Sequence, residues 1–500
     1  MDRKVRNLVS SIFPTSSRSP NPNDYALLAT TEQSSPASSI LLGETKADSL
    51  THSRLSLLRF FFFLLPSPIQ RRLRPGLFKP QRLYPTSYLD GLRGVASLLV
   101  YFCHFTEGNV GWYMNSYGLS AEDDNVASSP LQLPFLRVLY HGRIMVHIFF
   151  VISGFVLSYK PLKLTRKRDY ADLHATLSSS IFRRGLRLFL PTTVSTFMVM
   201  MFIRFGWMGT PMPSFWAQFW DWTDAVWRIT YSWNWDITQS LPYDEHLWTI
   251  PIEMGHSLLL FVTICGLSRC KTWLRLFFLS SIMLYCLKCQ HWAAFEFLGG
   301  ALIAEVGLIQ VARAERDANK EAADLEPAVA SKGCQVFWMA NFVIALFIAG
   351  WPNNGADRTP VFRHLVPLTP DPFFSTGGDV ISFFWYALGS LQVVIACQQV
   401  PVIQRLFTSS FAQYLASISY ALYLMHGPIL NVLAHRWMPY IWSIGGGADQ
   451  FWGRVFAWFG GIFILGIPII WAADVFWRAV DTPCVEFARW FEGICLVKED

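Results

Sequence analysis

The sequence predicts an all-α fold, a polytopic bundle of about ten helices that cross a lipid bilayer. Three observations support this prediction. Of the 500 residues, 52% are hydrophobic and only 15% are charged, whereas a soluble domain usually carries about 25% charged residues. The 41 Phe and 21 Trp residues are side chains that membrane interfaces favour. Apolar runs of nearly spanning length recur along the chain.

These apolar runs, ten in all, define the elements that we expect. Each is close to the length that a helix needs to cross the hydrocarbon core. They lie at 88–105, 141–159, 188–208, 247–267, 273–290, 292–312, 335–351, 380–398, 411–433 and 453–477. We therefore expect one transmembrane domain over residues 88–490.

The flanking segments have a different composition. Residues 1–54 are rich in Ser, Thr, Pro and Asn and lack the apolar stretch of a signal peptide, so we expect a disordered cytosolic tail. Residues 55–87 begin with a short apolar run that contains Arg59, which predicts an interfacial helix followed by a basic linker. Residues 491–500 are expected to be a cytosolic tail.

Basic residues set the expected orientation. They gather before the first run, after the second and after the fourth, and the segments between these are poor in Lys and Arg. The positive-inside rule then places both termini in the cytosol. The endoplasmic reticulum or another endomembrane is the expected location. The net charge of +6 fits basic cytosolic loops, so we expect no nucleic-acid partner. The nine Cys show no disulfide or zinc pattern.

The first apolar run contains polar side chains that cannot face lipid. Arg93 and His104 are eleven residues apart, which on a helix is about 20° past three full turns. Asp90, Ser97 and Tyr101 share their face at spacings of three and four residues. Ionisable groups within a membrane face a bundle interior or a wet cavity and are functional candidates. The alternatives are an Arg93–Asp90 ion pair and a histidine that only packs between helices.

Two later runs carry further polar groups. Glu253 and His256 lie one turn apart at the start of the fourth run, where a carboxylate needs a partner. A contact between Glu253 and His104 is geometrically possible. Tyr420, Tyr423 and His426 follow at three-residue steps in the ninth run.

Three arginines, Arg183, Arg184 and Arg187, precede the third run, at its expected cytosolic mouth. They either set topology and contact lipid headgroups or bind the phosphates of a substrate. The loop at 209–246 is crowded with Trp, which favours an interfacial aromatic belt or a platform for an apolar acceptor.

At these residues the chain resembles the acyltransferase-3 family of membrane proteins, in its fungal form. The family has an Arg and a His with ten residues between them in an LDGLRG-like first helix. An FFxxSGF-type stretch, an arginine-rich entry to the third helix, a Trp-to-Glu segment and an SYxLYLxH segment follow in that order. The matching residues, in order, are Asp90, Arg93, His104, Phe149, Phe150, Ser153, Gly154, Phe155, Arg183, Arg184, Arg187, Pro191, Trp248, Glu253, Ser419, Tyr420, Tyr423 and His426. Pro251 interrupts the Trp-to-Glu segment. The segment DTPCVEFAR near the C-terminus loosely resembles the motif that closes the family's domain, but it has Asp481 where a Glu is common.

The resemblance implies transfer of an acyl group, commonly acetyl, from cytosolic acyl-CoA to a hydroxyl of a small molecule or glycan. It implies catalytic roles for His104, Arg93, Glu253 and His426, with His104 as general base. Arg93, Arg183, Arg184 and Arg187 would bind the donor. Asp90, Tyr101, Ser153, Trp248, Tyr420 and Tyr423 would bind substrate. We expect acyl-CoA as co-substrate, no tightly bound cofactor and no metal.

Other mechanisms and functions stay open at this point. An acyl-enzyme could form on His104 or Ser153, although the sequence contains no GxSxG or HxxxD. A transporter of a hydrophobic metabolite could also use a polar-lined bundle, but the sequence shows no inverted repeat. A catalytically inactive scaffold is the third possibility. The residues specify neither the acceptor nor the oligomeric state.

Overall fold

The computed structural model describes residues 49–77, 82–119, 128–233, 241–321 and 332–497. Within these ranges the chain is helical and contains no strand, and only an isolated bridge joins Asn115 to Asn354. The all-α prediction is confirmed. Most of the predicted N-terminal tail, residues 1–48, lies outside the described ranges.

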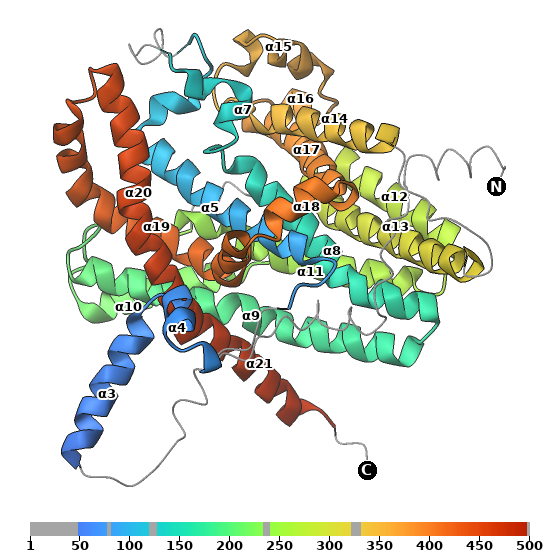
Figure 1. The fold of residues 1–500 in the computed structure, drawn as a ribbon, viewed down its shortest axis with the longest axis horizontal. Coiled ribbons are helices and arrows are strands. Elements are labelled where there is room, and N and C mark those ends of the chain that lie inside the picture. The colour runs from blue at the N-terminus through green and yellow to red at the C-terminus, as the bar shows by residue number, and fades with distance from the viewer. Residues whose placement is uncertain (1–48, 78–81, 120–127, 234–240, 322–331, 498–500) are drawn as a thin grey trace. The chain divides into compact units, whose positions relative to one another are not determined.

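Each of the ten predicted apolar runs contains a helix (Figure 1). These helices are α5 (Ser87–Asn109), α8 (Arg143–Lys167), α9 (Tyr170–Arg204), α11 (Thr249–Leu267), α12 (Thr272–Lys288), α13 (Trp292–Glu321), α14 (Lys332–Ala349), α17 (Asp379–Gln399), α19 (Ser410–Gly445) and α20 (Phe451–Phe476).

Shorter helices flank and connect them. They are α3 (Ser49–Leu64), α4 (Ser67–Leu73), α7 (Pro134–Arg137), α10 (Phe215–Ile229), α15 (Phe362–Leu365), α16 (Phe373–Thr376), α18 (Pro401–Phe407) and α21 (Thr482–Cys495). Single 3-10 turns occur at Pro75–Leu77, Gly111–Met114 (η3), Pro130–Gln132 (η4), Glu245–Trp248 (η5), Ala356–Arg358 and Val366–Leu368, and a π-helical turn lies at Trp477–Asp481.

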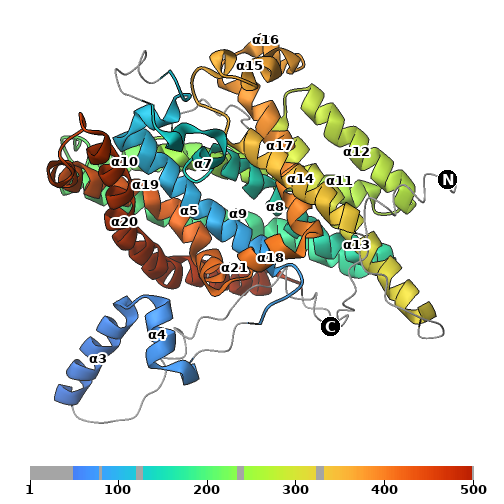
Figure 2. The ribbon, with the colours of Figure 1, turned by 45° about the horizontal axis from the view of Figure 1, so that its top comes forward.

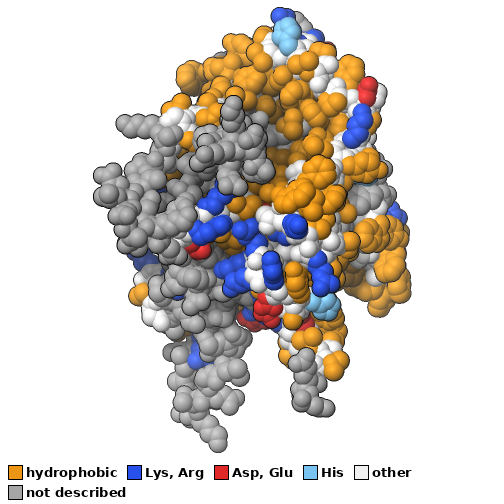
Figure 3. Space-filling model, turned by 90° about the vertical axis from the view of Figure 1, so that its right-hand side faces the viewer, with side chains coloured by type: hydrophobic (Ala, Val, Ile, Leu, Met, Phe, Trp, Pro, Cys, Tyr) orange, Lys and Arg blue, Asp and Glu red, His pale blue; other side chains and the backbone are white. Residues whose placement is uncertain are grey.

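Six helical segments in the described part of the chain are long and apolar enough to cross a membrane. They are Arg143–Lys167, Tyr170–Arg204, Glu245–Leu267, Trp292–Arg316, Asp379–Gln399 and Phe451–Cys495. Large apolar side chains remain exposed on α11, α12 and α14, such as Val262, Trp273 and Val336. Figure 3 shows hydrophobic side chains over much of one face, with Lys and Arg gathered below them. This surface suits lipid tails bordered by headgroups.

The chain forms two compact units, which we describe separately. The first contains Tyr84–Ile181 and Ile252–Gln413, and the second contains the described residues up to Leu83, Phe182–Pro251 and the chain from Tyr414 onward. Helices α9, α11 and α19 each begin in one unit and end in the other.

Close packing of α8 against α13 forms the centre of the first unit (Figure 1). A Cβ on Gly154 would lie 2.1 Å from the carbonyl oxygen of Phe297, and a Cβ on Gly300 would lie 2.1 Å from that of Val151. Only glycine allows the two backbones to approach this closely, as is common between membrane helices.

Buried ionisable groups on α8, α12 and α13 contact one another. Glu296 on α13 is fully buried, and its Oε1 lies 2.5 Å from Nδ1 of the buried His147 on α8. Glu305 lies further along α13. Its Oε1 is 2.6 Å from Nη2 of Arg275 and 3.3 Å from Nη1 of Arg166. Since unpaired charges are costly to bury, these contacts fix which faces of α8, α12 and α13 meet.

In the second unit, Asp474 on α20 holds the hairpin of α3 and α4, drawn in blue in Figure 2. Its carboxylate accepts hydrogen bonds from the Ser67 hydroxyl at 2.7 Å, from Tyr414 at 3.0 Å and from Arg478 Nε at 2.8 Å. Arg478 in turn donates to the carbonyl oxygens of Phe63 and Leu65. These bonds satisfy carbonyls that the end of α3 leaves without helical partners.

Three helices continue beyond the segments that the sequence predicted. Helix α9 begins at Tyr170, so Arg183, Arg184 and Arg187 lie within the helix, just before the predicted third run. Helix α5 continues to Asn109, four residues past the predicted end of the first run. Helix α21 ends at Cys495 and therefore crosses the predicted boundary at residue 490.

Candidate active site

Helix α5 carries the two side chains on which the predicted chemistry depends. Arg93 Nη2 lies 3.7 Å from Asp90 Oδ1, and 41% of the Arg93 side chain is exposed. His104 lies three turns further along α5 and is also partly exposed. Ser97 and Tyr101, between them, are buried. The spacing that predicted a shared face is thus the spacing within one continuous helix.

The partner of His104 is Glu107, which sequence reasoning missed. Glu107 Oε2 lies 3.2 Å from His104 Nδ1, and both side chains are about one third exposed. The prediction had placed Glu107 in a loop because the first run was expected to end at residue 105. A helix continued by one more turn would have revealed the pair, since residues three apart are neighbours on a helix.

Glu107 also contacts the start of α8 and the segment that follows α14. Its Oε1 accepts a hydrogen bond from Asn353 Nδ2 at 3.2 Å and lies 3.5 Å from Arg143 Nη2. Asn353 Oδ1 in turn accepts a hydrogen bond from Nε2 of His141 at 2.8 Å. With Oε1 engaged on this side, Oε2 remains directed at His104. Burial lowers the pKa of His141 to about 4, so this histidine is neutral at pH 7.

Local structure explains why these connecting segments are ordered. Ser129 and Gln132 form a capping box at η4. The buried Arg137 guanidinium donates to the carbonyl oxygens of Asn115 and Gln132, both at 2.7 Å. These contacts join α7 to the segments that precede it, and the His141 backbone N–H donates to the Arg137 carbonyl oxygen at 2.8 Å.

Helix α19, in the second unit, carries the other predicted group. The Tyr420 hydroxyl donates to the Leu188 carbonyl oxygen at 2.7 Å. The Tyr423 hydroxyl forms a short hydrogen bond with the His246 carbonyl oxygen and lies 2.6 Å from Thr249 Oγ1. His426 is buried, one turn further along. The two tyrosines therefore join α19 to α9 and η5.

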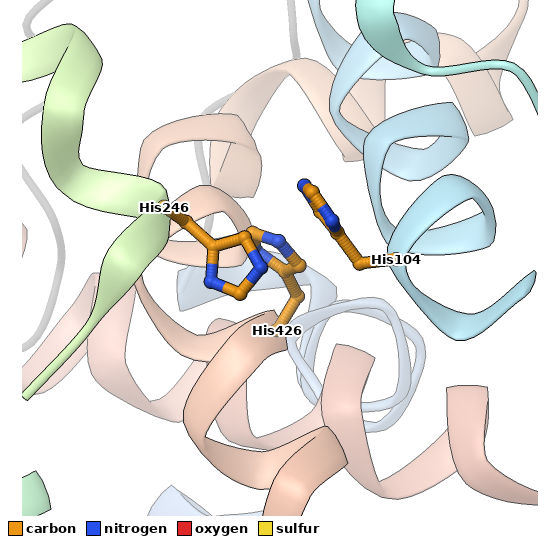
Figure 4. Close-up of side chains that lie close together, drawn as sticks. All are labelled: His104, His246 and His426. Carbon is orange, nitrogen blue, oxygen red and sulfur yellow. The ribbon is translucent and has the colours of Figure 1, made fainter. Parts of the chain in front are cut away.

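A second histidine, which the sequence analysis also missed, lies beside His426. His246 belongs to η5, and the centres of the two imidazole rings are 4.9 Å apart (Figure 4). Asp244 Oδ1 lies 2.7 Å from His246 Nδ1. Figure 4 also labels His104, which α5 of the first unit carries. The sequence signal that could have indicated His246 is Asp244, which lies two residues before it at the start of an apolar run.

The remaining predicted residues are distributed over several helices. Arg183 pairs with Glu492 of α21 at 3.1 Å. Ser153 is half-buried on α8, next to the tightly packed Gly154, while Trp248 at the end of η5 and Glu253 in the first turns of α11 are also half-buried. In the SGF motif, Gly154 thus serves helix packing.

Few groups within either unit are arranged to hold a metal ion. In the described part of the second unit, His246 and His426 offer ring nitrogens within 4.8 Å of each other. Imidazole nitrogens are common ligands of zinc.

Comparison with known proteins decides the family. The family model described as an acyltransferase domain, Acyl_transf_3, matches residues 86–478. The chain belongs to the acyltransferase-3 family. The match covers α5 to the start of the π-helical turn, and so includes every predicted site residue. It confirms the resemblance and shows that the protein is a membrane enzyme that transfers acyl groups.

Two relatives of this acyltransferase are informative. It is 32% identical over 456 residues to O-acetyltransferase PaAT-1 of Phomopsis amygdali. The aligned region covers 84% of this chain and 87% of the relative. It is 25% identical over 466 residues to acyltransferase clz18 of Cochliobolus lunatus, which covers 80% of this chain and 95% of the relative. No solved structure matches the acyltransferase significantly.

Proposed function

We propose that this membrane acyltransferase moves an acetyl group from acetyl-CoA to a hydroxyl of a small-molecule acceptor, with His104 as the general base. Similarity to an O-acetyltransferase over most of both chains supports acetyl as the acyl group. The observation that carries the proposal is the pairing of His104 Nδ1 with Glu107 Oε2 at 3.2 Å.

This pairing assigns the protonation of the imidazole. A carboxylate can only accept, so the Nδ1–H of His104 donates to Glu107, and Nε2 is the ring nitrogen that can take up a proton. A carboxylate on the opposite nitrogen also stabilises the imidazolium that forms during the reaction, as it does in hydrolases with a serine, histidine and aspartate triad. General-base catalysis of this kind typically contributes a factor of about 10² to 10⁴ in rate.

The proposed reaction is a direct transfer. The acceptor hydroxyl oxygen forms a bond to the thioester carbonyl carbon, and its proton passes to His104 Nε2. The bond between that carbon and the CoA sulfur then breaks, and the thiolate leaves and takes up a proton to become the free thiol of CoA. The products are the acetyl ester and CoA in equal amounts.

We assign binding of the CoA phosphates to guanidinium groups, which match phosphate geometry. Arg93 is the first candidate because two-fifths of its side chain is exposed on α5. Arg184 and Arg187 on α9 are further candidates. Arg183 already contacts Glu492, so donor binding there would compete with an ion pair. We further propose that both termini face the cytosol, where acetyl-CoA is made, and that the membrane is an endomembrane.

A pair of histidine variants tests the proposal. His104→Ala should lower acetyl transfer by at least 100-fold while the protein still inserts and stays monodisperse in detergent. His174→Ala is the matched control, because His174 lies exposed on α9 in the same unit and has no proposed role. Radiolabelled acetyl-CoA and an extract from a strain that lacks the gene supply donor and acceptor. Equal turnover by the wild type and His104→Ala would remove His104 from the mechanism.

A further inference from the structure

Three features hold the His246 ring in one position. Asp244, whose side chain is only 2% exposed, accepts hydrogen bonds from the ring Nδ1 at 2.7 Å and from the His246 backbone N–H at 3.0 Å. The Tyr423 hydroxyl holds the His246 carbonyl oxygen. The third feature is Gly427: a Cβ at this position would lie 2.5 Å from His246 Nδ1 and 2.8 Å from Cε1.

Gly427 therefore is glycine because the His246 ring occupies the place of a side chain. Its position immediately after His426 in the chain brings the two imidazoles together, with ring centres 4.9 Å apart (Figure 4). A histidine that only fills space can pack against a residue with a side chain, whereas the His246 ring requires glycine at position 427 of the neighbouring helix. The arrangement is over-determined, as is typical of side chains that must keep a functional geometry.

Both rings have the same tautomer. His426 Nδ1 lies 2.7 Å from the Tyr423 carbonyl oxygen, which can only accept, so this nitrogen carries the hydrogen. His246 Nδ1 likewise donates to the Asp244 carboxylate. In each neutral ring, Nε2 is then the nitrogen that gains or loses a proton.

We propose that His246 and His426 form a proton-donating imidazole pair, in which His426 is the general acid for the leaving group and His246, held by Asp244, is its positioning residue. The inference rests on the proposed acetyl transfer. When the bond between the acyl carbon and the CoA sulfur breaks, the thiolate takes a proton from the pair. The proton released by the acceptor hydroxyl later restores the pair through solvent.

Chemical rescue distinguishes this role from a structural one. His246→Ala should reduce kcat for acetyl transfer about 100-fold and leave the KM for acetyl-CoA within twofold. Added imidazole should restore a large part of kcat in a concentration-dependent manner, because it can occupy the space of the missing ring. A variant that has lost only packing does not regain turnover from a free imidazole.

Two glycine variants complete the test in the full-length protein. Gly427→Ala keeps both histidines but displaces the His246 ring, so kcat should fall as in His246→Ala and imidazole should not restore it. Gly460→Ala is the matched control, since its Cβ would meet only ordinary contacts of 3.6 to 3.8 Å in the same unit, and it should behave as the wild type.

The outcomes separate this inference from the proposed function. Wild-type protein that transfers no acetyl group from acetyl-CoA would overturn the proposed function. Normal wild-type turnover together with an unimpaired His246→Ala variant would overturn the imidazole pair alone. A loss in His246→Ala that imidazole leaves unchanged would also overturn it.

Discussion

Substitution of Gly154 by alanine should separate α8 from α13 and destabilise the first unit. The new Cβ would lie 2.1 Å from the Phe297 carbonyl oxygen, whereas carbon and oxygen atoms in close contact approach to about 3.3 Å. The two backbones must therefore move apart by about 1.2 Å at this crossing. Gly300, in the same crossing, has an equally close contact, so α8 has little freedom to slide along α13.

The expected loss is about 3 kcal/mol, the upper part of the range measured for overpacked cores. Separation of the helices also lengthens the contact between His147 and Glu296, which is 2.5 Å in the intact unit. Thermal unfolding in detergent, followed by circular dichroism at 222 nm, measures the effect as a lower midpoint temperature.

Gly266→Ala is the matched control for this prediction. Gly266 is an exposed glycine on α11 in the same unit, and a Cβ there would meet no atom within 4 Å. Alanine has the higher helix propensity, so this variant should be neutral or up to about 1 kcal/mol more stable. A Gly154→Ala protein that unfolds at the same temperature as Gly266→Ala would refute the packing argument.

Two further predictions concern buried polar groups. Burial lowers the pKa of His141 from 6.5 to about 4, so the unfolded chain binds a proton that the folded chain does not between these pH values. Folding stability should therefore fall by about 3 kcal/mol as the pH is lowered from 7 to 4, with a shallower fall in His141→Gln when midpoint temperatures are compared. Asp474→Asn leaves the buried Arg478 without its charge partner, which should cost about 3–5 kcal/mol and loosen α3 and α4. Limited trypsin digestion should then cleave after Arg71 faster than in the wild type, and an unchanged cleavage rate would contradict the role given to Asp474.

The sequence predicted the positions of the helices well, although only six helical segments in the described part of the chain are long and apolar enough to cross a membrane. The ten runs each contain a helix, since lipid leaves the backbone few alternatives to helical hydrogen bonding. The ends were predicted poorly, because charged residues can continue a helix beyond the hydrocarbon core. Arg183 is an example: it lies inside α9, ahead of the predicted run at 188–208.

The candidate site was only partly predictable, for a related reason. His104 and His426 stand out because polar residues are rare inside apolar runs. Glu107 and His246 lie just outside those runs, where polar residues are common and carry no signal by themselves. Contacts such as that between His246 and Gly427 join segments far apart in the sequence, and no local pattern indicates them.

The most direct test of the account is a mass balance with purified wild-type protein. Acetyl-CoA and an acceptor extract are incubated with the protein, and free CoA thiol and acetylated product are measured together by mass spectrometry. The account predicts that both appear in equal amounts and that both fall at least 100-fold with His104→Ala. Movement of an unmodified metabolite across proteoliposomes, with no CoA released, would contradict it and identify a transporter instead.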